Sequence, residues 1–229
     1  MSNCAIIVAA GKGRRMGAGI NKLYLKLNGK PILAHTLEAF QKCNYIDSII
    51  LVCSKDEIDY CKQEIIVKYN IKKVKDIAIG GKERQHSVMS GLKAAKGCNI
   101  VLIHDGARPF VDESMILNGI KYAEMYGASA CGVEPKDTIK VRDKDSFSKF
   151  TPDRSTLFAV QTPQCFKYDL IVKAHEYVEQ ESIQVTDDTS VVEAYGNKVY
   201  LYYGGYTNIK ITTLEDIAIG ERILLDLAE

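Results

Sequence analysis

The residues from Ile6 to Gly17, which read IIVAAGKGRRMG, decide the fold of this chain. Cys4 to Ala10 form an unbroken apolar run of the kind found in a strand that is buried on both faces. Gly11 and Gly13 end the run, and they allow the backbone to turn sharply and a ligand to approach closely. Because phosphates bind where the first strand of an open α/β sheet ends, this stretch predicts a phosphate site.

The spacing of the glycines and cations discriminates among phosphate-binding loops. Gly17 comes one residue too late for the G-x-G-x-x-G pattern of dinucleotide-binding folds, and no G-x-x-x-x-G-K-[ST] run occurs. Lys12, Arg14 and Arg15 follow the turn instead, and such a cluster suits a triphosphate whose leaving group gains charge. A surface turn with solvated charges is the alternative interpretation.

The composition is that of a globular chain with one large domain. It has 229 residues, of which 46% are hydrophobic and 26% charged, and its net charge is +1. A charge so near zero gives no general attraction to nucleic acid or to a membrane, so we expect neither as a partner. No apolar run approaches the roughly 20 residues that span a bilayer, and the first residues lack the basic segment of a signal peptide. The seven cysteines are scattered without a C-x-x-C pair, which favours a reducing, cytoplasmic location.

Strand patterns alternate with helical patterns over residues 3–133. We expect strands at 4–10, 48–53, 74–79, 99–104 and 128–133, and helices at 32–43, 56–69, 83–95 and 112–126. This alternation predicts an α/β fold with a Rossmann-like, mostly parallel sheet flanked by helices. Ligands of such sheets bind at the carboxyl ends of the strands.

The alternation changes near Pro135. Residues 137–142 and 147–151 are short charged segments around a turn, and they predict a β-hairpin arm that projects from the sheet. A lone two-stranded hairpin is marginally stable, so we expect residues 136–156 to be a dimerisation arm of one domain that spans 1–229.

Charged residues follow several of the later strands. Asp105 directly follows strand 99–104, where a carboxylate either holds Mg²⁺ together with substrate phosphates or caps the turn. Arg108 adds a guanidinium that is suited to phosphate. The glycine break before Ser87 opens a helix whose amides can bind a base or a phosphate, although a plain helix start fits equally well. Lys210 lies in a short apolar strand, where it either guards a sheet edge or faces a charge in a cleft.

Six short motifs occur in one order along nearly the whole chain. They are the glycine loop, Asn21 to Tyr24, His104 to Pro109, Gln161 to Gln164, Thr186 to Asp188, and Asn208 to Thr212. In type and spacing these motifs resemble the 2-C-methyl-D-erythritol 4-phosphate cytidylyltransferase family. The resemblance implies transfer of CMP from CTP to 2-C-methyl-D-erythritol 4-phosphate, with release of pyrophosphate, in non-mevalonate isoprenoid biosynthesis. It also implies Mg²⁺ as the cofactor and a homodimer.

The resemblance further implies a role for individual residues. Arg15 and Lys22 stabilise the α-phosphate and the departing pyrophosphate, while Lys210 and Arg154 of the partner subunit position the attacking phosphate. The residues implied to surround the nucleotide are Ala9, Ala10, Gly11, Gly13, Gly81 and Ser87. Those implied to line the acceptor site are Asp105, Arg108, Thr138, Thr162 and Thr186, and Asp105 also contacts the metal.

Two positions depart from the family pattern, and three other functions fit part of the sequence. Asn21 stands where proline is common, and Lys82 stands where an acidic residue is common. A ribitol 5-phosphate cytidylyltransferase shares the glycine loop and the lysine. A non-catalytic nucleotide-sensing module shares the fold but does not need cations around the α-phosphate. A glycosyltransferase ordinarily carries a D-x-D metal motif, which the run after His104 does not supply.

Overall fold

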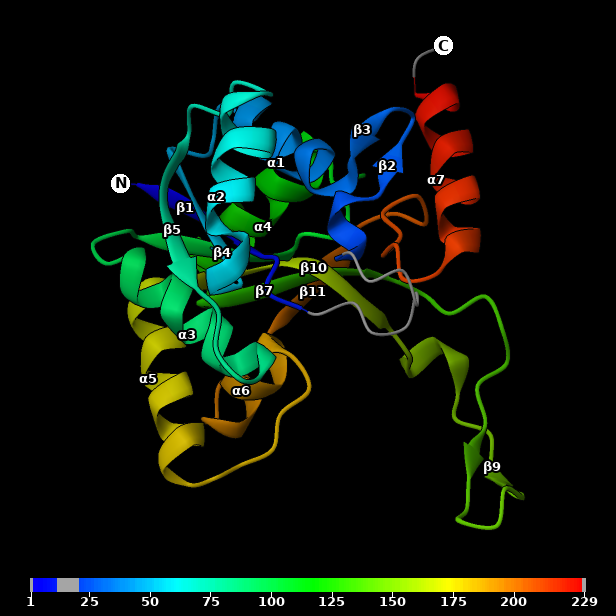
Figure 1. Ribbon diagram of the computed structural model, residues 1–229. Coiled ribbons are helices and arrows are strands. Elements are labelled where there is room, and N and C mark those ends of the chain that lie inside the picture. Colours follow the sequence, from blue (N-terminus) through cyan, green and yellow to red (C-terminus); the bar gives the residue numbers. More distant parts are fainter. Residues whose placement is uncertain (1, 12–20, 228–229) are drawn as a thin grey trace.

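A seven-stranded sheet forms the centre of the protein (Figure 1). The computed structural model describes residues 2–11 and 21–227. The strands of the sheet are β1 (Asn3–Val8), β4 (Ser48–Cys53), β5 (Val74–Ile79), β6 (Ile100–Asp105), β7 (Ala128–Val133), β10 (Ala159–Lys167) and β11 (Tyr200–Tyr203). They lie in the order β11-β7-β10-β6-β1-β4-β5. Only β10 is antiparallel to its neighbours, so the sheet is mostly parallel, as predicted.

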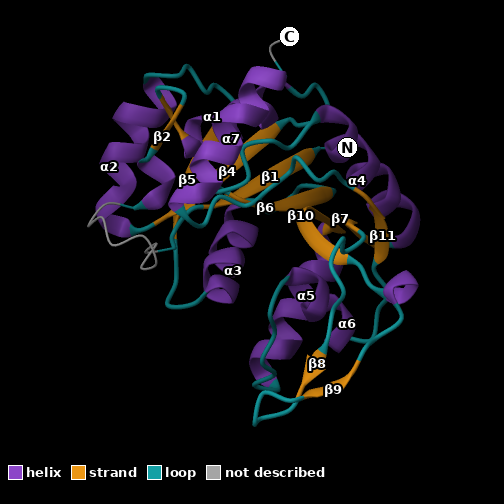
Figure 2. Ribbon diagram, turned by 90° about the vertical axis from the view of Figure 1, so that its right-hand side faces the viewer, coloured by secondary structure: helices purple, strands orange, loops and turns teal. Residues whose placement is uncertain are grey.

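Helices cover both faces of the sheet and produce three layers (Figures 1 and 2). One face carries α1 (Ile32–Lys42), α2 (Ile58–Tyr60), α4 (Glu113–Tyr126) and α7 (Leu214–Asp226), and the other carries α3 (Arg84–Ala94), α5 (Tyr168–Gln180) and α6 (Asp188–Ala194). Each face has its own core, and successive residues of β1 serve both cores. Ile7 belongs to the core that contains Phe40, and Ile6 belongs to the core that contains Phe166. Burial on both faces explains the unbroken apolar run of this strand.

The segment predicted as a helix at 56–69 is helical but irregular. A 3₁₀ turn at Lys55–Glu57 leads into the single turn of α2, and a π-helix follows at Cys61–Val67. Cys61 and Ile65 are both buried in this stretch and attach it to the core. The sequence pattern therefore predicted a helical segment correctly but not its hydrogen-bond pattern.

Two hairpins lie outside the central sheet. β2 (Lys26–Leu27) and β3 (Lys30–Pro31) are joined by a tight turn at Asn28 and Gly29, which have φ of 48° and 78°. The predicted arm contains β8 (Val141–Arg142) and β9 (Ser148–Phe150), which pair with each other and not with the central sheet. The arm points away from the body (Figures 1 and 2). Its strands are shorter than predicted, and the register of their pairing shifts between Val141 and Arg142.

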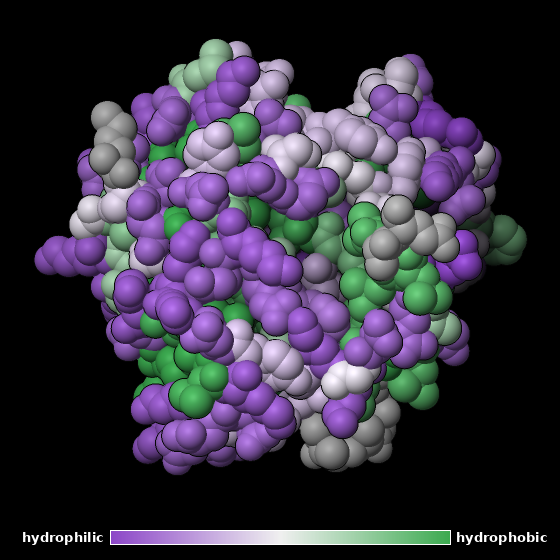
Figure 3. Space-filling model, turned by 90° about the horizontal axis from the view of Figure 1, so that it is seen from above, coloured by the Kyte–Doolittle hydropathy of each residue, from purple (hydrophilic) through white to green (hydrophobic). Residues whose placement is uncertain are grey.

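The cysteines form no disulfides, and the face seen in Figure 3 is mostly hydrophilic. All seven cysteines are free thiols, and all but Cys98 are buried. Hydrophilic residues cover most of the face seen in Figure 3, and the apolar residues there form separate patches. Within residues 2–11 and 21–227, no helix is both long and apolar enough to cross a membrane.

Candidate active site

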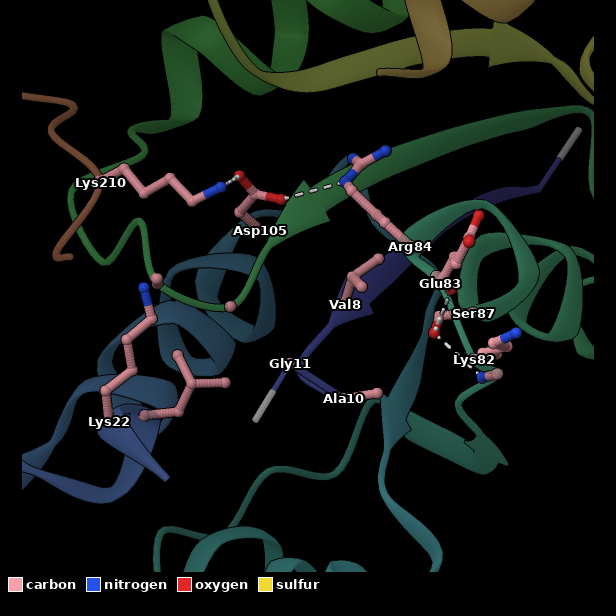
Figure 4. Close-up of a pocket in the computed structure, with 14 residues that line it drawn as sticks. Val8, Ala10, Gly11, Lys22, Lys82, Glu83, Arg84, Ser87, Asp105 and Lys210 are labelled. Atoms are coloured by element: carbon pink, nitrogen blue, oxygen red, sulfur yellow. Dashed lines mark hydrogen bonds and ion pairs between the residues drawn. The ribbon is translucent and has the colours of Figure 1, made fainter. Parts of the chain in front are cut away.

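A cavity of about 810 Å³ lies where β1 and β6 end and α3 begins (Figure 4). The two strands are adjacent and parallel, with Val8 opposite Asp105, so their carboxyl ends open at the same edge of the sheet. The predicted site residues that line the cavity are Ala10, Gly11, Lys22, Gly81, Ser87, Asp105 and Lys210. Seven residues from five separate stretches of sequence therefore meet in one place.

The turn after β1 lies directly against the loop before α3. Gly80 has no room for a side chain, because a Cβ atom there would lie 2.2 Å from the Cβ of Ala10. Ser87 holds the loop in place: its hydroxyl donates to the Glu83 carbonyl oxygen at 3.2 Å and accepts from the Gly81 N–H at 3.0 Å. The loop thus forms a firm wall of the cavity, and Ser87 shapes it as well as lining it.

Only part of the predicted phosphate loop is described, and within that part Ala9 does not line the cavity. Lys12, Gly13, Arg14 and Arg15 lie outside the described residues. Ala9 is described, but only 1% of its surface is exposed. Its N–H donates to the carbonyl oxygen of Val52 at 2.7 Å, so it supports the turn from within the sheet.

Asp105 ends β6 and faces two cations (Figure 4). Its Oδ2 lies 2.6 Å from Nζ of Lys210, and its Oδ1 lies 3.7 Å from Nε of Arg84. Burial raises the pKa of the Asp105 carboxyl, but Lys210 and then Arg84 outweigh burial and lower that pKa from 3.8 to about 2. The carboxylate is therefore ionised at neutral pH, and Lys210 faces a charge in a cleft.

Arg84 joins the cavity to a buried ion pair that the sequence analysis did not single out. One of its terminal nitrogens lies 2.6 Å from Oδ2 of Asp188, and Oδ1 of Asp188 lies 3.1 Å from Nε2 of His175. Burial lowers the pKa of the Arg84 guanidinium, but Asp188 and then Asp105 outweigh burial and raise it above its usual value. In the sequence, the feature that could have pointed to Arg84 is its position at the start of the helix that follows the glycine break. Its carboxylate partners come from β6 and α6, which only the fold brings together.

Lys22 enters the cavity from a short, well-capped turn. The 3₁₀ helix at Lys22–Tyr24 begins at Asn21, whose side chain accepts from the Leu23 N–H at 3.1 Å. Nζ of Lys22 donates to the Ile211 carbonyl oxygen at 2.9 Å. Asn21, one of the two departures from the family pattern, therefore has a capping role in this chain.

The segment 208–211 is not the short strand that we expected. The N–H of Ile211 donates to the Ala107 carbonyl oxygen at 2.9 Å, which holds the segment against the turn after β6. One terminal nitrogen of Arg108 also donates to the Asn208 carbonyl oxygen, at 2.7 Å. The backbone of this segment therefore bonds to the turn after β6 and not to a neighbouring strand. These bonds place Lys210 next to Asp105.

Arg108 and Thr162 support the cavity from behind its lining. Arg108 uses at least one of its N–H groups to bond to the Asn208 carbonyl oxygen, and it does not line the cavity. Only 4% of Thr162 is exposed, and its Oγ1 lies 3.1 Å from the backbone nitrogen of Asp105 and 3.0 Å from Nδ1 of His104.

The remaining predicted residues lie away from this cavity. Arg154 and Thr138 are exposed on the arm, where a terminal nitrogen of Arg154 donates to the Thr138 hydroxyl at 3.1 Å. Thr186 lines a separate hollow of about 80 Å³, which adjoins the main cavity at Arg84. The cavity of a single chain therefore does not gather all of the expected acceptor-binding residues.

Comparisons with known proteins agree with this geometry. The chain matches the family model described as "IspD: 2-C-methyl-D-erythritol 4-phosphate cytidylyltransferase" over residues 3–226. Relatives of that name from Clostridium acetobutylicum and Clostridium novyi are 60% and 61% identical over 222 residues, which is 97% of this chain and 97% and 96% of theirs. The crystal structure of 4-diphosphocytidyl-2C-methyl-D-erythritol synthase from Anaerococcus prevotii is similar with a TM-score of 0.86 and 36% identity, and the match covers 98% of this chain and 96% of that one.

The similarity extends from the first strand to the last helix and includes every described element that lines the cavity. The chain therefore belongs to the 2-C-methyl-D-erythritol 4-phosphate cytidylyltransferase family.

Proposed function

We propose that the protein transfers CMP from CTP to 2-C-methyl-D-erythritol 4-phosphate, which yields 4-diphosphocytidyl-2-C-methyl-D-erythritol and pyrophosphate. The observation that carries this proposal is the meeting of Lys22, Lys210 and Asp105 in one cavity of a chain of this family. The backbone at Gly11 and Gly81 lines the same cavity and leaves room for a nucleotide to approach the main chain.

The cavity suits a reaction between two anions. An oxygen of the acceptor phosphate forms a bond to the α-phosphorus of CTP, while the bond from that phosphorus to the bridging oxygen breaks and pyrophosphate leaves. The attacking phosphate is already ionised, so no general base is needed. Lys22 and Lys210 offset the repulsion between the reactants and stabilise the charge on the leaving group. By analogy with donors that stabilise an oxyanion, one such cation lowers the barrier by roughly 3–4 kcal/mol.

Asp105 fits the role of a Mg²⁺ ligand that acts together with the substrate. Mg²⁺ in nucleotide sites is held by one or two carboxylates and by phosphate oxygens, and it keeps several waters. Asp105 is an ionised carboxylate that lines the cavity, whereas the described residues contain no cluster of three His, Cys, Asp or Glu that could hold a metal unaided. When bound, Mg²⁺ neutralises part of the triphosphate charge.

We also propose that residues 136–156 pair two copies of the chain and that Arg154 and Thr138 serve the partner's cavity. Both residues are on the arm and neither lines the cavity of its own protomer. The arm exposes three apolar side chains, Phe147, Phe150 and Ile139, with 73%, 53% and 42% of their surfaces accessible. Apolar groups on a two-stranded arm are best buried against a second copy.

A mixture of two inactive variants tests the exchange of the arm. Lys22→Ala and Arg154→Ala each remove one cation from every site of their own homodimers. In a mixed dimer, one site keeps both cations if the arm serves the partner. Random mixing then restores about a quarter of wild-type activity, because about half the dimers are mixed and each has one intact site. No recovery after the subunits have exchanged would contradict the proposal. Arg142→Ala, which removes another exposed arginine of the arm, is the matched control and retains activity.

A cytoplasmic location is part of the proposal. Its support is the set of seven free thiols, since a chain folded in an oxidising compartment commonly pairs its cysteines.

Pyrophosphate release tests the reaction and the acceptor together. The purified protein is incubated with CTP and Mg²⁺ and with either 2-C-methyl-D-erythritol 4-phosphate or ribitol 5-phosphate. Release with the branched acceptor alone is expected. Release with ribitol 5-phosphate alone would keep the mechanism and replace the acceptor. No release with either, from folded protein that binds CTP, would favour a nucleotide-sensing module.

A further inference from the structure

His104 lies at the centre of the framework that supports the cavity, although it does not line the cavity itself. It is the residue before Asp105 on β6, and it is completely buried. Its ring packs against Phe40 with centroids 4.9 Å apart. Nε2 lies 3.0 Å from the Arg108 carbonyl oxygen, and Nδ1 lies 3.0 Å from Oγ1 of Thr162. Both ring nitrogens therefore have a partner in the strands and turns that build the site.

The chemistry of the partners determines the direction of each hydrogen bond. The Arg108 carbonyl oxygen can only accept, so Nε2 of His104 carries the proton and Nδ1 is an acceptor. The Thr162 hydroxyl must then donate to Nδ1. The same hydroxyl oxygen accepts from the backbone N–H of Asp105 at 3.1 Å. A directed chain of three hydrogen bonds thus runs from the Asp105 N–H through Thr162 and His104 to the Arg108 carbonyl group.

This chain closes around the turn that carries the charged residues of the site. The Arg108 N–H donates to the Asp105 carbonyl oxygen at 3.0 Å, which forms the turn itself. Asn208 connects the turn to the segment of Lys210: its side chain donates to the Thr162 carbonyl oxygen at 3.0 Å, and its own carbonyl oxygen accepts from Arg108. The imidazole of His104 is therefore connected by hydrogen bonds both to Asp105 and to the segment that carries Lys210.

A second consequence concerns Thr162. Its only hydroxyl proton is used by His104, so this hydroxyl has no proton to donate to a phosphate of the substrate. With 4% of its surface exposed, Thr162 offers little surface to a substrate, and its bond to the Asp105 N–H is its link to the residues that line the cavity.

We propose that His104, as the imidazole protonated on Nε2, and Thr162 are positioning residues for the transfer reaction: together they hold Asp105 in the orientation in which it meets Lys210 and Arg84. This inference rests on the proposed cytidylyl transfer, because it assigns the two residues a place in that reaction. The bond to the backbone N–H of Asp105 fixes the main chain from which the carboxylate extends towards the two cations. Small displacements of a charged group strongly reduce transition-state stabilisation.

Thr162→Val and Thr162→Ser separate the hydroxyl from the shape of the side chain. Valine keeps the shape, and we expect it to lower kcat by about ten- to a hundredfold, because it leaves the Asp105 N–H and Nδ1 of His104 unpaired. Serine restores the hydroxyl, and we expect kcat within about threefold of the wild type. Ser129→Ala is the matched control: it removes a fully buried hydroxyl that donates to the Gly119 carbonyl oxygen, far from the cavity, and it lowers Tm without lowering kcat.

A double-mutant cycle with Asp105→Asn distinguishes positioning from a general structural role. If Thr162 acts through Asp105, Thr162→Val lowers kcat by less than about threefold further once Asp105 is asparagine. Full additivity of the two effects would overturn the proposal. So would wild-type kcat in a Thr162→Val protein whose Tm is reduced as in the Ser129→Ala control.

His104 itself is tested by two substitutions and one measurement without a variant. Asparagine places its carbonyl oxygen near Nδ1 and keeps an acceptor for Thr162, whereas glutamine keeps only a donor near Nε2; we expect His104→Asn to retain more activity than His104→Gln. The reverse order would overturn the proposal. Nitrogen NMR of the histidine rings in the intact protein is expected to show His104 protonated on Nε2, and protonation on Nδ1 would also overturn it. An inactive wild-type enzyme would refute the proposed function itself, whereas an active enzyme with unaffected variants would refute only this inference.

Discussion

We predict that protonation of His104 in mild acid lowers the free energy of unfolding. Burial is the main reason that the pKa of this imidazole is lowered from 6.5 to about 4, and its bond to the Arg108 carbonyl oxygen only partly offsets burial. As the pH falls from 6.5 to about 4, the unfolded chain binds a proton at His104 that the folded protein does not bind. The free energy of unfolding therefore falls through this range and is unaffected by His104 above it. At 1.36 kcal/mol per pKa unit, the full loss is about 3 kcal/mol.

Urea unfolding between about pH 7.5 and about pH 4.5 measures this effect in the wild type and in His104→Asn. Asparagine cannot bind a proton, so the wild type should lose stability more steeply than the variant as the pH falls. The half-buried His35, whose pKa is also lowered mainly by burial, is present in both proteins, and its contribution cancels. Equal slopes in the two proteins would refute the reasoning. If His104→Asn does not fold, the proton NMR signal of the His104 ring in the wild type gives the same test, because it should not shift between about pH 7.5 and about pH 5.5.

Three further substitutions test the site and the core. Lys22→Ala should lower kcat by about a hundred- to a thousandfold with a much smaller change in the KM for CTP, as measured by steady-state pyrophosphate release, because its ammonium acts on the transition state; a rise in KM alone would indicate ground-state binding. Lys210→Met should raise the pKa of Asp105, because Lys210 is the main cause of its lowered value. In the wild type, this lowered pKa contributes stability above about pH 4, and that contribution is lost as the pH falls towards about 2. The acid-unfolding midpoint, followed by circular dichroism, should therefore move to higher pH, and an unchanged midpoint would show that Arg84 alone suffices. Gly91→Ala should destabilise the fold by about 1–3 kcal/mol in urea unfolding, since its Cβ would lie 2.4 Å from Cγ2 of Ile6; an unchanged Tm would mean that α3 can shift freely.

The sequence predicted the core of the fold well because that core depends on local patterns. The apolar runs of β1, β4 and β6 are continuous since helices cover both faces of these strands, and that feature can be recognised without a partner strand. The arm was also predicted, from a change in spacing and a charged turn. The segment 208–211 was predicted incorrectly because its hydrogen bonds go to a distant turn and not to a neighbouring strand.

The site was predicted in part, and the difference has a physical cause. Gly11, Lys22 and Asp105 stand next to strand ends and short motifs, so their place at the cavity follows from local sequence. Arg84 was missed because its two carboxylate partners come from other elements. His104 stood in the sequence only as the first residue of one family motif, yet both of its ring nitrogens bond to the turn of the site or to the strand beside it.

By itself, the sequence determined the alternating α/β order, the position of the glycine turn and the family motifs. These features depend on residues that are close in the chain, and burial and turn formation act on them locally. Only the tertiary structure decided which charges pair: it placed Lys210 within 2.6 Å of Asp105, although more than a hundred residues separate them in the chain. Electrostatic attraction and hydrogen-bond direction depend on distances in space, and those distances exist only once the sheet has brought the strand ends to one edge.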